Sequence, residues 1–262
     1  MDAADFNLSP IGFFRCGQRY RFETPRQGAF ADNSGVIILN DDQRLVDACR
    51  DLEGVERIWI IFGFHLNATW KSFVQPPVSP GGKKISLFAT RSPHRPNRLG
   101  LSCVILDKIE KNSLYIRNFD LLDNTPVFDI KPYIPAADSF PDSRVPWLDD
   151  VKLDTCKLIY SKEALARIQF IIQQGGPDLK NFCDVQLVSD PFNSARKRVV
   201  ALGGNQWSIG CRTWQIFFEQ KEHNVLEIKN IKSNYPAEEL MQTVDRYGDK
   251  KLHRDFTAVF EL

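Results

Sequence analysis

Arginines, aspartates and histidines in short, turn-rich segments are the residues of this chain best suited to chemistry. One such segment, Ala89–Ser102, holds three arginines, one histidine and two prolines. Each proline fixes its own φ angle and pushes the preceding residue toward an extended conformation, so this loop is expected to hold its side chains in place. Guanidinium groups held in this way suit a carboxylate or phosphate partner.

A second segment, 119–135, contains the run Asp120-Leu121-Leu122-Asp123 at the expected end of a strand. Its carboxylates can accept hydrogen bonds from an ammonium group or from sugar hydroxyls. Two further segments carry candidate groups, Pro25-Arg26-Gln27 near the start and His65 after an apolar run. Taken singly, each feature also has an ordinary structural explanation, such as turn aspartates or a histidine at a strand edge.

Basic residues gather in two stretches without any acidic residue, Arg57–Leu106 and Pro191–Phe218, although the net charge of the chain is only +1. Cations without acidic neighbours suit an anionic partner such as nucleic acid. A solvated face whose acids come from elsewhere in the fold is the alternative. The residues expected to contact nucleic acid are Lys83, Lys84, Arg95, Arg98, Arg196, Lys197 and Arg198.

The elements that must position these groups are mainly strands. Short runs rich in β-branched and aromatic residues, most of them bounded by turn residues, predict strands over 36–39, 57–64, 84–89, 101–109 and 113–121. One helix, capped by Asp41 or Asp42 and stopped by Gly54, interrupts them. Strands in sequence with few helices favour an antiparallel sheet or barrel over a doubly wound Rossmann sheet, and no Gly-rich nucleotide-binding motif appears.

The pattern changes after a proline-rich, linker-like segment at 135–146. We therefore expect a β domain over 1–145, a smaller α+β domain over 146–235 and a helical tail over 236–262. In the second domain Ser161 and Asp178 are expected to cap helices, and 214–218 and 225–231 to form strands. In the tail, Leu240, Met241, Val244 and Tyr247 predict one amphipathic helix.

Several classes of protein are excluded or disfavoured by composition. The chain has 262 residues, 43% of them hydrophobic, which is enough for a sizeable core. Its longest apolar run, Ile58–Phe64, is far short of the ~20 residues that span a bilayer. Six scattered cysteines without a CxxC pair and four scattered histidines predict no metal site. The acidic start, Met1–Asp5, predicts no signal peptide, so we expect a cytoplasmic protein.

Taken together, the four segments resemble the TsaA-like family of tRNA (adenine-N6)-methyltransferases. The resemblance is strong over residues 8–140 and weaker through Asp190-Pro191 and 214–231. The matching motifs are Pro25-Arg26-Gln27, Phe64-His65, Ala89–Asn97 with Gly100-Leu101-Ser102, Asp120–Val127 and Asp129–Pro135. Arg98 departs from the family pattern, which more often has a small residue or proline there; Asn124 and Phe128 are milder departures.

The resemblance implies a β-barrel methyltransferase domain, S-adenosylmethionine as cofactor and a homodimer. It also implies methylation of N6 of threonylcarbamoyladenosine at anticodon-loop position 37 of threonine tRNA. The cofactor contacts that it implies are Pro25, Arg26, Gln27, His65, Leu66, Arg91, Leu101, Asp120, Leu121, Leu122 and Asp123.

A base near N6 would assist the transfer, and Asp120, His65 and Tyr133 are the candidates, among which the sequence does not choose. An alternative of another class is a regulatory module that binds S-adenosylmethionine or tRNA without transferring a methyl group. A purely structural β domain is disfavoured, because no packing argument requires the loop Arg91–Asn97.

Overall fold

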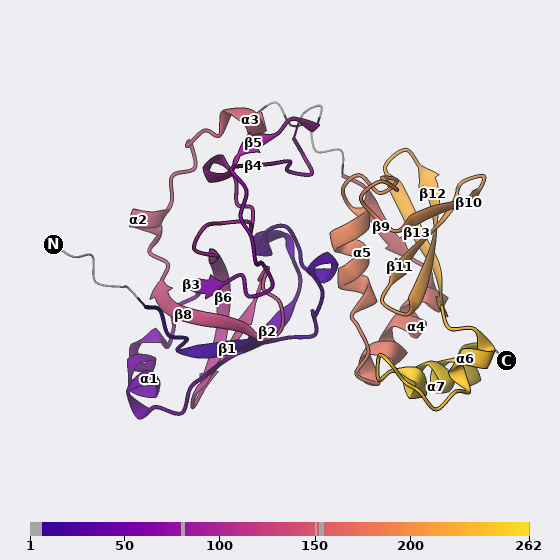
Figure 1. Ribbon diagram of the computed structural model, residues 1–262, viewed down its shortest axis with the longest axis horizontal. Helices are drawn as coiled ribbons and strands as arrows, with labels where there is room; N and C mark the ends of the chain where they lie inside the picture. Colours follow the sequence, from indigo (N-terminus) through magenta and orange to yellow (C-terminus); the bar gives the residue numbers. More distant parts are fainter. Residues whose placement is uncertain (1–6, 80–81, 150, 152–154, 262) are drawn as a thin grey trace. The chain divides into compact units, whose positions relative to one another are not determined.

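The computed structural model describes residues 7–79, 82–149, 151 and 155–261 (Figure 1). The acidic start, on which the expectation of no signal peptide rests, lies outside these residues. The chain divides into two compact units, Met1–Leu153 and Asp154–Leu262. The boundary expected from the sequence, between residues 145 and 146, lies a few residues before this division. Within the described ranges, no helix combines the length and apolar character needed to cross a bilayer.

The first unit is a closed barrel of six strands in the order β1-β2-β7-β6-β3-β8, which confirms the expected β-barrel fold class. All neighbouring strands run antiparallel. The strands are β1 (Gly12–Arg15), β2 (Ser34–Leu39), β3 (Arg57–Gly63), β6 (Leu99–Glu110), β7 (Ser113–Arg117) and β8 (Thr125–Pro132). A small hairpin of β4 (Phe73–Val74) and β5 (Ile85–Ser86) stands apart from the barrel sheet.

Short helices connect the strands of the first unit. They are α1 (Gln43–Ala48), α2 (Pro135–Asp138), α3 (Pro146–Asp149) and the 3-10 turns η1 (Arg21–Glu23), η2 (Gly28–Phe30), η3 (Arg50–Leu52) and η5 (Leu87–Ala89). Asp42 caps α1 by accepting a hydrogen bond from the Arg44 amide at 2.9 Å, as one of the two expected caps. The segment that composition marked as a linker therefore contains one helix, α2, and the first residue of another, α3.

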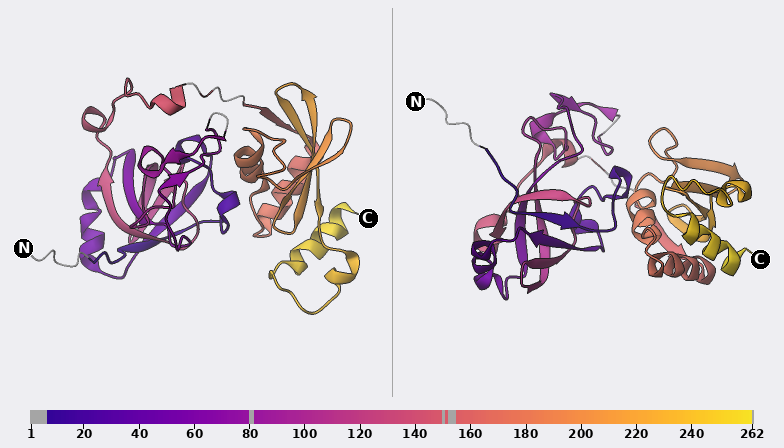
Figure 2. Two further views of the ribbon diagram at one scale, coloured as in Figure 1. Left: turned by 45° about the horizontal axis from the view of Figure 1, so that its top comes forward. Right: turned by 60° about the horizontal axis from the view of Figure 1, so that its bottom comes forward.

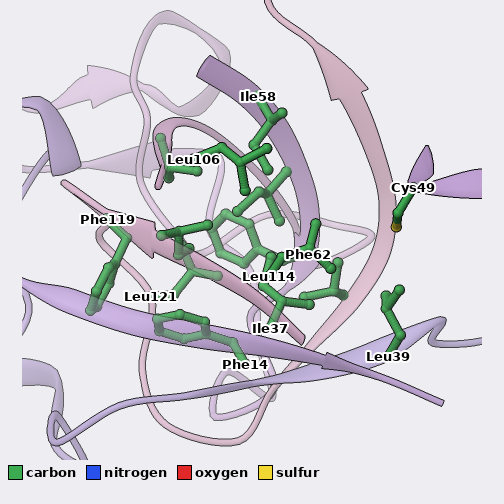
Figure 3. Packing of buried hydrophobic residues seen from close by; sticks show 14 residues of the cluster. Phe14, Ile37, Leu39, Cys49, Ile58, Phe62, Leu106, Leu114, Phe119 and Leu121 are labelled. Carbon is green, nitrogen blue, oxygen red and sulfur yellow. The ribbon is translucent and has the colours of Figure 1, made fainter. Parts of the chain in front are cut away.

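The interior of the barrel is filled by alternate residues of its strands (Figure 3). Phe14 of β1 meets Phe119 edge-on, with ring centroids 4.5 Å apart. Phe62 of β3 fills the space beside Gly100, where an added Cβ would lie 2.4 Å from the Phe62 ring. The position of the Phe62 ring thus requires a residue without a side chain on β6.

Two expected strands are shorter in the structure, and three strands of the first unit, β1, β4 and β8, were not expected. The run 84–89 forms only β5 before the chain turns into η5, and the run 113–121 ends at Arg117 because Asn118 takes a φ angle of 58°. Of the unexpected strands, β8 contains two prolines, which are typical of turns. Pairing with β1 on one side and β3 on the other outweighs that local preference.

The second unit is a five-stranded sheet in the order β10-β11-β12-β13-β9, in which only β9 runs parallel to its neighbour. Figure 2 shows these strands with α4 and α5 beside them. Ser161 and Asp178 cap the two helices as expected, accepting from the amides of Ala164 and Asn181. The elements are β9 (Lys157–Tyr160), α4 (Lys162–Gln173), α5 (Leu179–Leu187), β10 (Val199–Gly203), β11 (Gln206–Cys211), β12 (Trp214–Glu222) and β13 (Val225–Ser233).

The tail forms two helices, α6 (Ala237–Leu240) and α7 (Lys250–Phe260), rather than the single helix expected from 236 onward. Of the expected apolar face, Leu240 is buried, whereas Met241, Val244 and Tyr247 are exposed. Further buried residues come from α7, where the His253 ring stacks on Trp214 with centroids 3.8 Å apart and Phe256 is fully covered. Because α7 packs on α4 and β13, the tail is part of the second unit.

Candidate cofactor and RNA-binding site

The loop 118–124, which follows β7, is joined to residues 28–33 by side-chain hydrogen bonds. The Asn118 amide donates to the Ala31 carbonyl at 2.7 Å. The Asn33 side chain both donates to the Phe119 carbonyl and accepts from the Phe119 amide, each at 3.0 Å. The buried ring of Phe119 anchors this loop in the core, so Asp120 leaves the barrel from a fixed backbone position.

Gly28 lets the N-terminal loop lie directly against this backbone. A Cβ at Gly28 would lie 2.3 Å from the Asn118 carbonyl oxygen and 2.8 Å from the Phe119 Cα. Only glycine permits such a close approach, since both obstacles are main-chain atoms. The three residues that precede Gly28, Pro25-Arg26-Gln27, are thereby held close to the loop that carries Asp120. Pro25 is buried and Arg26 is exposed.

A first polar cluster forms around Asp120. The Ser102 hydroxyl donates a hydrogen bond to the Asp120 carboxylate. Burial raises the pKa of Asp120, an effect that the Ser102 hydrogen bond and the nearby Arg91 oppose. Arg91 also donates to the Gln27 side chain at 3.2 Å. Three segments far apart in the sequence, 25–27, 91–102 and 118–123, therefore meet around the Asp120 carboxylate, with Gln27 reaching it through Arg91.

A second cluster forms around Asp123. Its side chain accepts from the Cys16 amide at 3.1 Å, and its amide donates to the Gln18 carbonyl at 2.7 Å. His65 follows β3 and lies within electrostatic reach of Asp123. Burial is the largest influence on His65 and lowers its pKa, so the imidazole is neutral at pH 7. Arg21 also lies near His65, and its guanidinium donates to the Leu66 carbonyl.

The four leucines assigned to the site divide into two kinds. The side chains of Leu66 and Leu101 are 47% and 57% exposed, so either can cover an apolar ring. The Leu121 side chain is in the core, which leaves its backbone alone available to a ligand. The Leu122 carbonyl already accepts from the Thr125 hydroxyl at 2.7 Å.

Tyr133 is separated from the other candidate bases. Its amide donates to the carbonyl of Arg57, the first residue of β3, and its ring packs on Trp59. His65 follows Gly63, the last residue of β3. At ~3.3 Å per residue, the length of β3 puts roughly 20 Å between the two ends. Within one chain, Tyr133 therefore lies at the end of the barrel away from His65.

The basic residues expected at an RNA interface also divide into two kinds. The exposed ones are Lys83, Lys84, Arg98, Arg196 and Arg198. By contrast, Arg95 donates to the carbonyls of Thr90 and Ser92, at 3.0 and 3.3 Å. Lys197 donates to the carbonyls of Gln186, in the last turn of α5, and of Ser189 and Asp190, which follow this helix. These two cations brace loops, and a phosphate would have to compete with the carbonyls.

Ser102, Asn33, Gly28 and Arg21 were not assigned a role from the sequence. Ser102 stands in a recognised motif, but its contact with Asp120 depends on β6 and the 118–124 loop meeting in the fold. Gly28 and Asn33 carry only the ordinary signal of turn residues. No group of three or more His, Cys, Asp or Glu side chains among the described residues is placed to hold a metal ion.

Comparisons with known proteins agree with this arrangement. Residues 14–139 match the family model for the N-terminal domain of tRNA-methyltransferase O. The chain is 32% identical over 201 residues to the tRNA (adenine(37)-N6)-methyltransferase of Escherichia coli K12, covering 74% of this chain and 85% of that protein. It is 44% identical over 140 residues to a Pseudomonas aeruginosa relative that carries the name S-adenosylmethionine-dependent methyltransferase RcsF, covering 52% of this chain and 58% of that one.

Among solved structures, the crystal structure of TrmO from Pseudomonas aeruginosa superposes with a TM-score of 0.66 at 26% identity, covering 89% of this chain and 99% of that one. The likeness thus extends beyond the barrel into the second unit. The sequence identity to the E. coli enzyme, the family model and the shared barrel lead to one conclusion: this chain belongs to the TsaA-like, or TrmO, family of tRNA (adenine-N6)-methyltransferases.

Proposed function

We propose that this protein transfers a methyl group from S-adenosylmethionine to N6 of the adenosine at position 37 of a tRNA. The observation that carries the proposal is the convergence of Gln27, Arg91 and Asp120 at the barrel of a chain that belongs to this family. The finer proposal, from the motif resemblance, is that the base is threonylcarbamoyladenosine and that threonine tRNA is a substrate.

The residues present fit S-adenosylmethionine by their chemistry. Asp120 and Asp123 offer carboxylate oxygens to its ammonium or ribose hydroxyls, and Arg26 and Arg91 offer guanidinium groups to its carboxylate. The exposed side chains of Leu66 and Leu101 suit its adenine ring. When bound, S-adenosylmethionine supplies an electrophilic methyl group. The contribution of the protein is then mainly to hold N6 in line with that group.

We propose His65 as the residue that accepts the proton from N6. Of the three candidates, Tyr133 is at the other end of the barrel, and Asp120 is engaged by Ser102. His65 is accessible to solvent, and the partial desolvation of its ring lowers its pKa, which favours the neutral imidazole. A neutral imidazole is the form that can take up a proton.

This assignment predicts a particular pH dependence. Because the protonated imidazole cannot act as a base, kcat should fall on the acid side, and the lowered pKa of His65 shifts that fall to a lower pH than an ordinary imidazole would give. In His65→Asn that acid limb should disappear and kcat should be lower at pH 7.5, while the Kd for S-adenosylmethionine is the control for binding. An acid limb of kcat that is unchanged in His65→Asn would transfer the role of base to Asp120.

The exposed lysines of the first unit predict a salt-dependent affinity for tRNA. Each phosphate contact that is removed should lower the slope of log affinity against log salt by roughly 0.7–0.9. We expect this for Lys83→Ala and Lys84→Ala in filter-binding titrations. Arg91→Ala should instead weaken the binding of S-adenosylmethionine or slow methyl transfer, with little change in the salt dependence of tRNA affinity. The reason is that Arg91 contacts Gln27 and lies near Asp120. Coinciding slopes in all variants would place tRNA elsewhere, most simply on Arg196 and Arg198.

The test of the proposed function is transfer of labelled methyl from S-adenosylmethionine to tRNA isolated from cells that lack the enzyme. Incorporation into tRNA supports the proposal. Donor binding by calorimetry without incorporation would favour the alternative, a regulatory module that keeps the pocket. The resemblance also carries the proposals of a homodimer, tested by sedimentation, and of a cytoplasmic location, where tRNA substrates are found.

A further inference from the structure

The hairpin of β4 and β5 has one buried and one exposed face. Phe73 pairs with Ser86 and Val74 with Ile85, and the Leu87 amide extends the pairing by donating to the Ser72 carbonyl at 2.9 Å. Ile85 and Leu87 are buried, whereas Phe73 and Phe88 are 61% and 77% exposed. Phe73 and its partner Ser86 lie on the face opposite Val74 and Ile85, and the exposed ring of Phe88 follows two residues after Ser86, in η5.

The surroundings of these rings are basic. Lys71 and Lys84 stand two residues before Phe73 and Ser86, just outside β4 and β5, and both are exposed. The whole hairpin lies within the stretch Arg57–Leu106, which contains no acidic residue. We call these four residues, Lys71, Phe73, Lys84 and Phe88, the hairpin face.

Phe88 is held in a fixed position although its ring is exposed. It is the central residue of η5, whose end is closed by hydrogen bonds from the Thr90 amide and hydroxyl to the Leu87 carbonyl, at 3.0 and 2.8 Å. Trp147 of α3 donates to the Ala89 carbonyl at 2.9 Å, and the Arg95 guanidinium lies 5.9 Å from the ring centroid. A rigid, solvent-facing ring beside a cation is an arrangement that suits a stacked base.

We propose that the hairpin face binds unpaired bases of a single-stranded RNA loop, which stack on Phe73 and Phe88 while Lys71 and Lys84 contact the phosphates. This inference rests on the proposed function. It adds that the part of the tRNA in contact with the hairpin face is an unpaired loop rather than a duplex stem. Aromatic rings interleaved with lysines are the usual means of holding single strands.

A second copy of this chain is the other occupant to consider. Two copies that met through this face would bring Lys71 and Lys84 toward the same lysines of the partner. No carboxylate from residues 57–106 is available to balance them. Such like-charge contacts oppose self-association, whereas the phosphates of RNA match the face.

The test compares two RNAs, an anticodon stem-loop and a blunt duplex with the same stem. We expect Phe88→Ala to raise the Kd for the stem-loop by about 5- to 100-fold and to leave that for the duplex unchanged. Because stacking releases no counterions, the salt slope should match that of the wild type, unlike the slope of Lys84→Ala. Phe88→Tyr, which keeps the ring, should retain most of the affinity.

Phe140→Ala is the matched control, because Phe140 is 71% exposed in the same unit but outside the hairpin. The inference would be overturned if Phe88→Ala lost affinity equally for stem-loop and duplex, or if its Kd for the stem-loop were unchanged. It would also be overturned if sedimentation showed that Phe88→Ala no longer dimerises and this accounted for its weaker RNA binding. Failure of the proposed function would appear differently, as a wild-type protein that binds the stem-loop and transfers no methyl group.

Discussion

Asp120→Asn is expected to weaken the binding of S-adenosylmethionine by about 10- to 150-fold, the equivalent of the ~1.5–3 kcal/mol of one charge-assisted hydrogen bond. The substitution keeps an oxygen that can accept from the Ser102 hydroxyl and removes only the negative charge. Calorimetry gives the Kd directly. An unchanged Kd in the folded variant would remove Asp120 from the donor site.

The same substitution should not destabilise the fold. Burial raises the pKa of Asp120, so the folded protein retains this proton to a higher pH than the unfolded chain does. The contribution of Asp120 to stability is therefore present at low pH and is lost as the pH rises through the raised pKa. Above that pH the ionised carboxylate is a cost, so Asp120→Asn should unfold there at the same or a higher temperature than the wild type. A lower melting temperature would mean that Asp120 has a structural role.

Gly28→Ala is expected to weaken donor binding by more than about tenfold, because its Cβ overlaps main-chain atoms that cannot move independently. Either the loop 25–27 or the loop 118–120 must shift, and both carry residues proposed to contact the donor. The variant should also melt at a lower temperature, since Asn33 and Asn118 connect the same two loops.

Gly17→Ala provides the matched control for this variant. Gly17 lies in the same unit, is exposed, and has no atom within 4 Å of the position of an added Cβ. It should bind the donor as the wild type does. If Gly28→Ala and Gly17→Ala bound the donor equally well, the close approach of the two loops would not be what forms the site.

The sequence predicted an antiparallel sheet or barrel because β-branched runs such as 57–64 and 101–109 are long enough to be recognised locally, and the family resemblance implied the barrel. It did not predict β8, since Pro126 and Pro132 are typical of turns and only pairing with β1 and β3 makes this segment a strand. The prediction of one helix in the tail was wrong for a related reason. Its apparent apolar period includes Met241 and Val244, yet burial depends on α7 packing against α4 and β13.

The sequence motifs assigned Asp120 and Arg91 to the candidate site by residue type, and the structure brings these two residues near each other. The sequence was less informative where a role depends on distant partners. Arg95 and Lys197 look like free cations in sequence, but backbone carbonyls engage both of them. Ser102 and Gly28 were given no role, because their contacts join segments 18 and 90 residues apart. Such contacts appear only once the barrel has closed.

The most direct test of the proposed function is a nucleoside analysis by mass spectrometry. Threonine tRNA that carries threonylcarbamoyladenosine at position 37 is incubated with the protein and S-adenosylmethionine and then digested. We predict that this nucleoside gains one methyl group, located on N6 by fragmentation, and that Asp120→Asn forms less of it at limiting donor. An unmethylated nucleoside, with wild-type protein that binds the donor, would contradict the proposal.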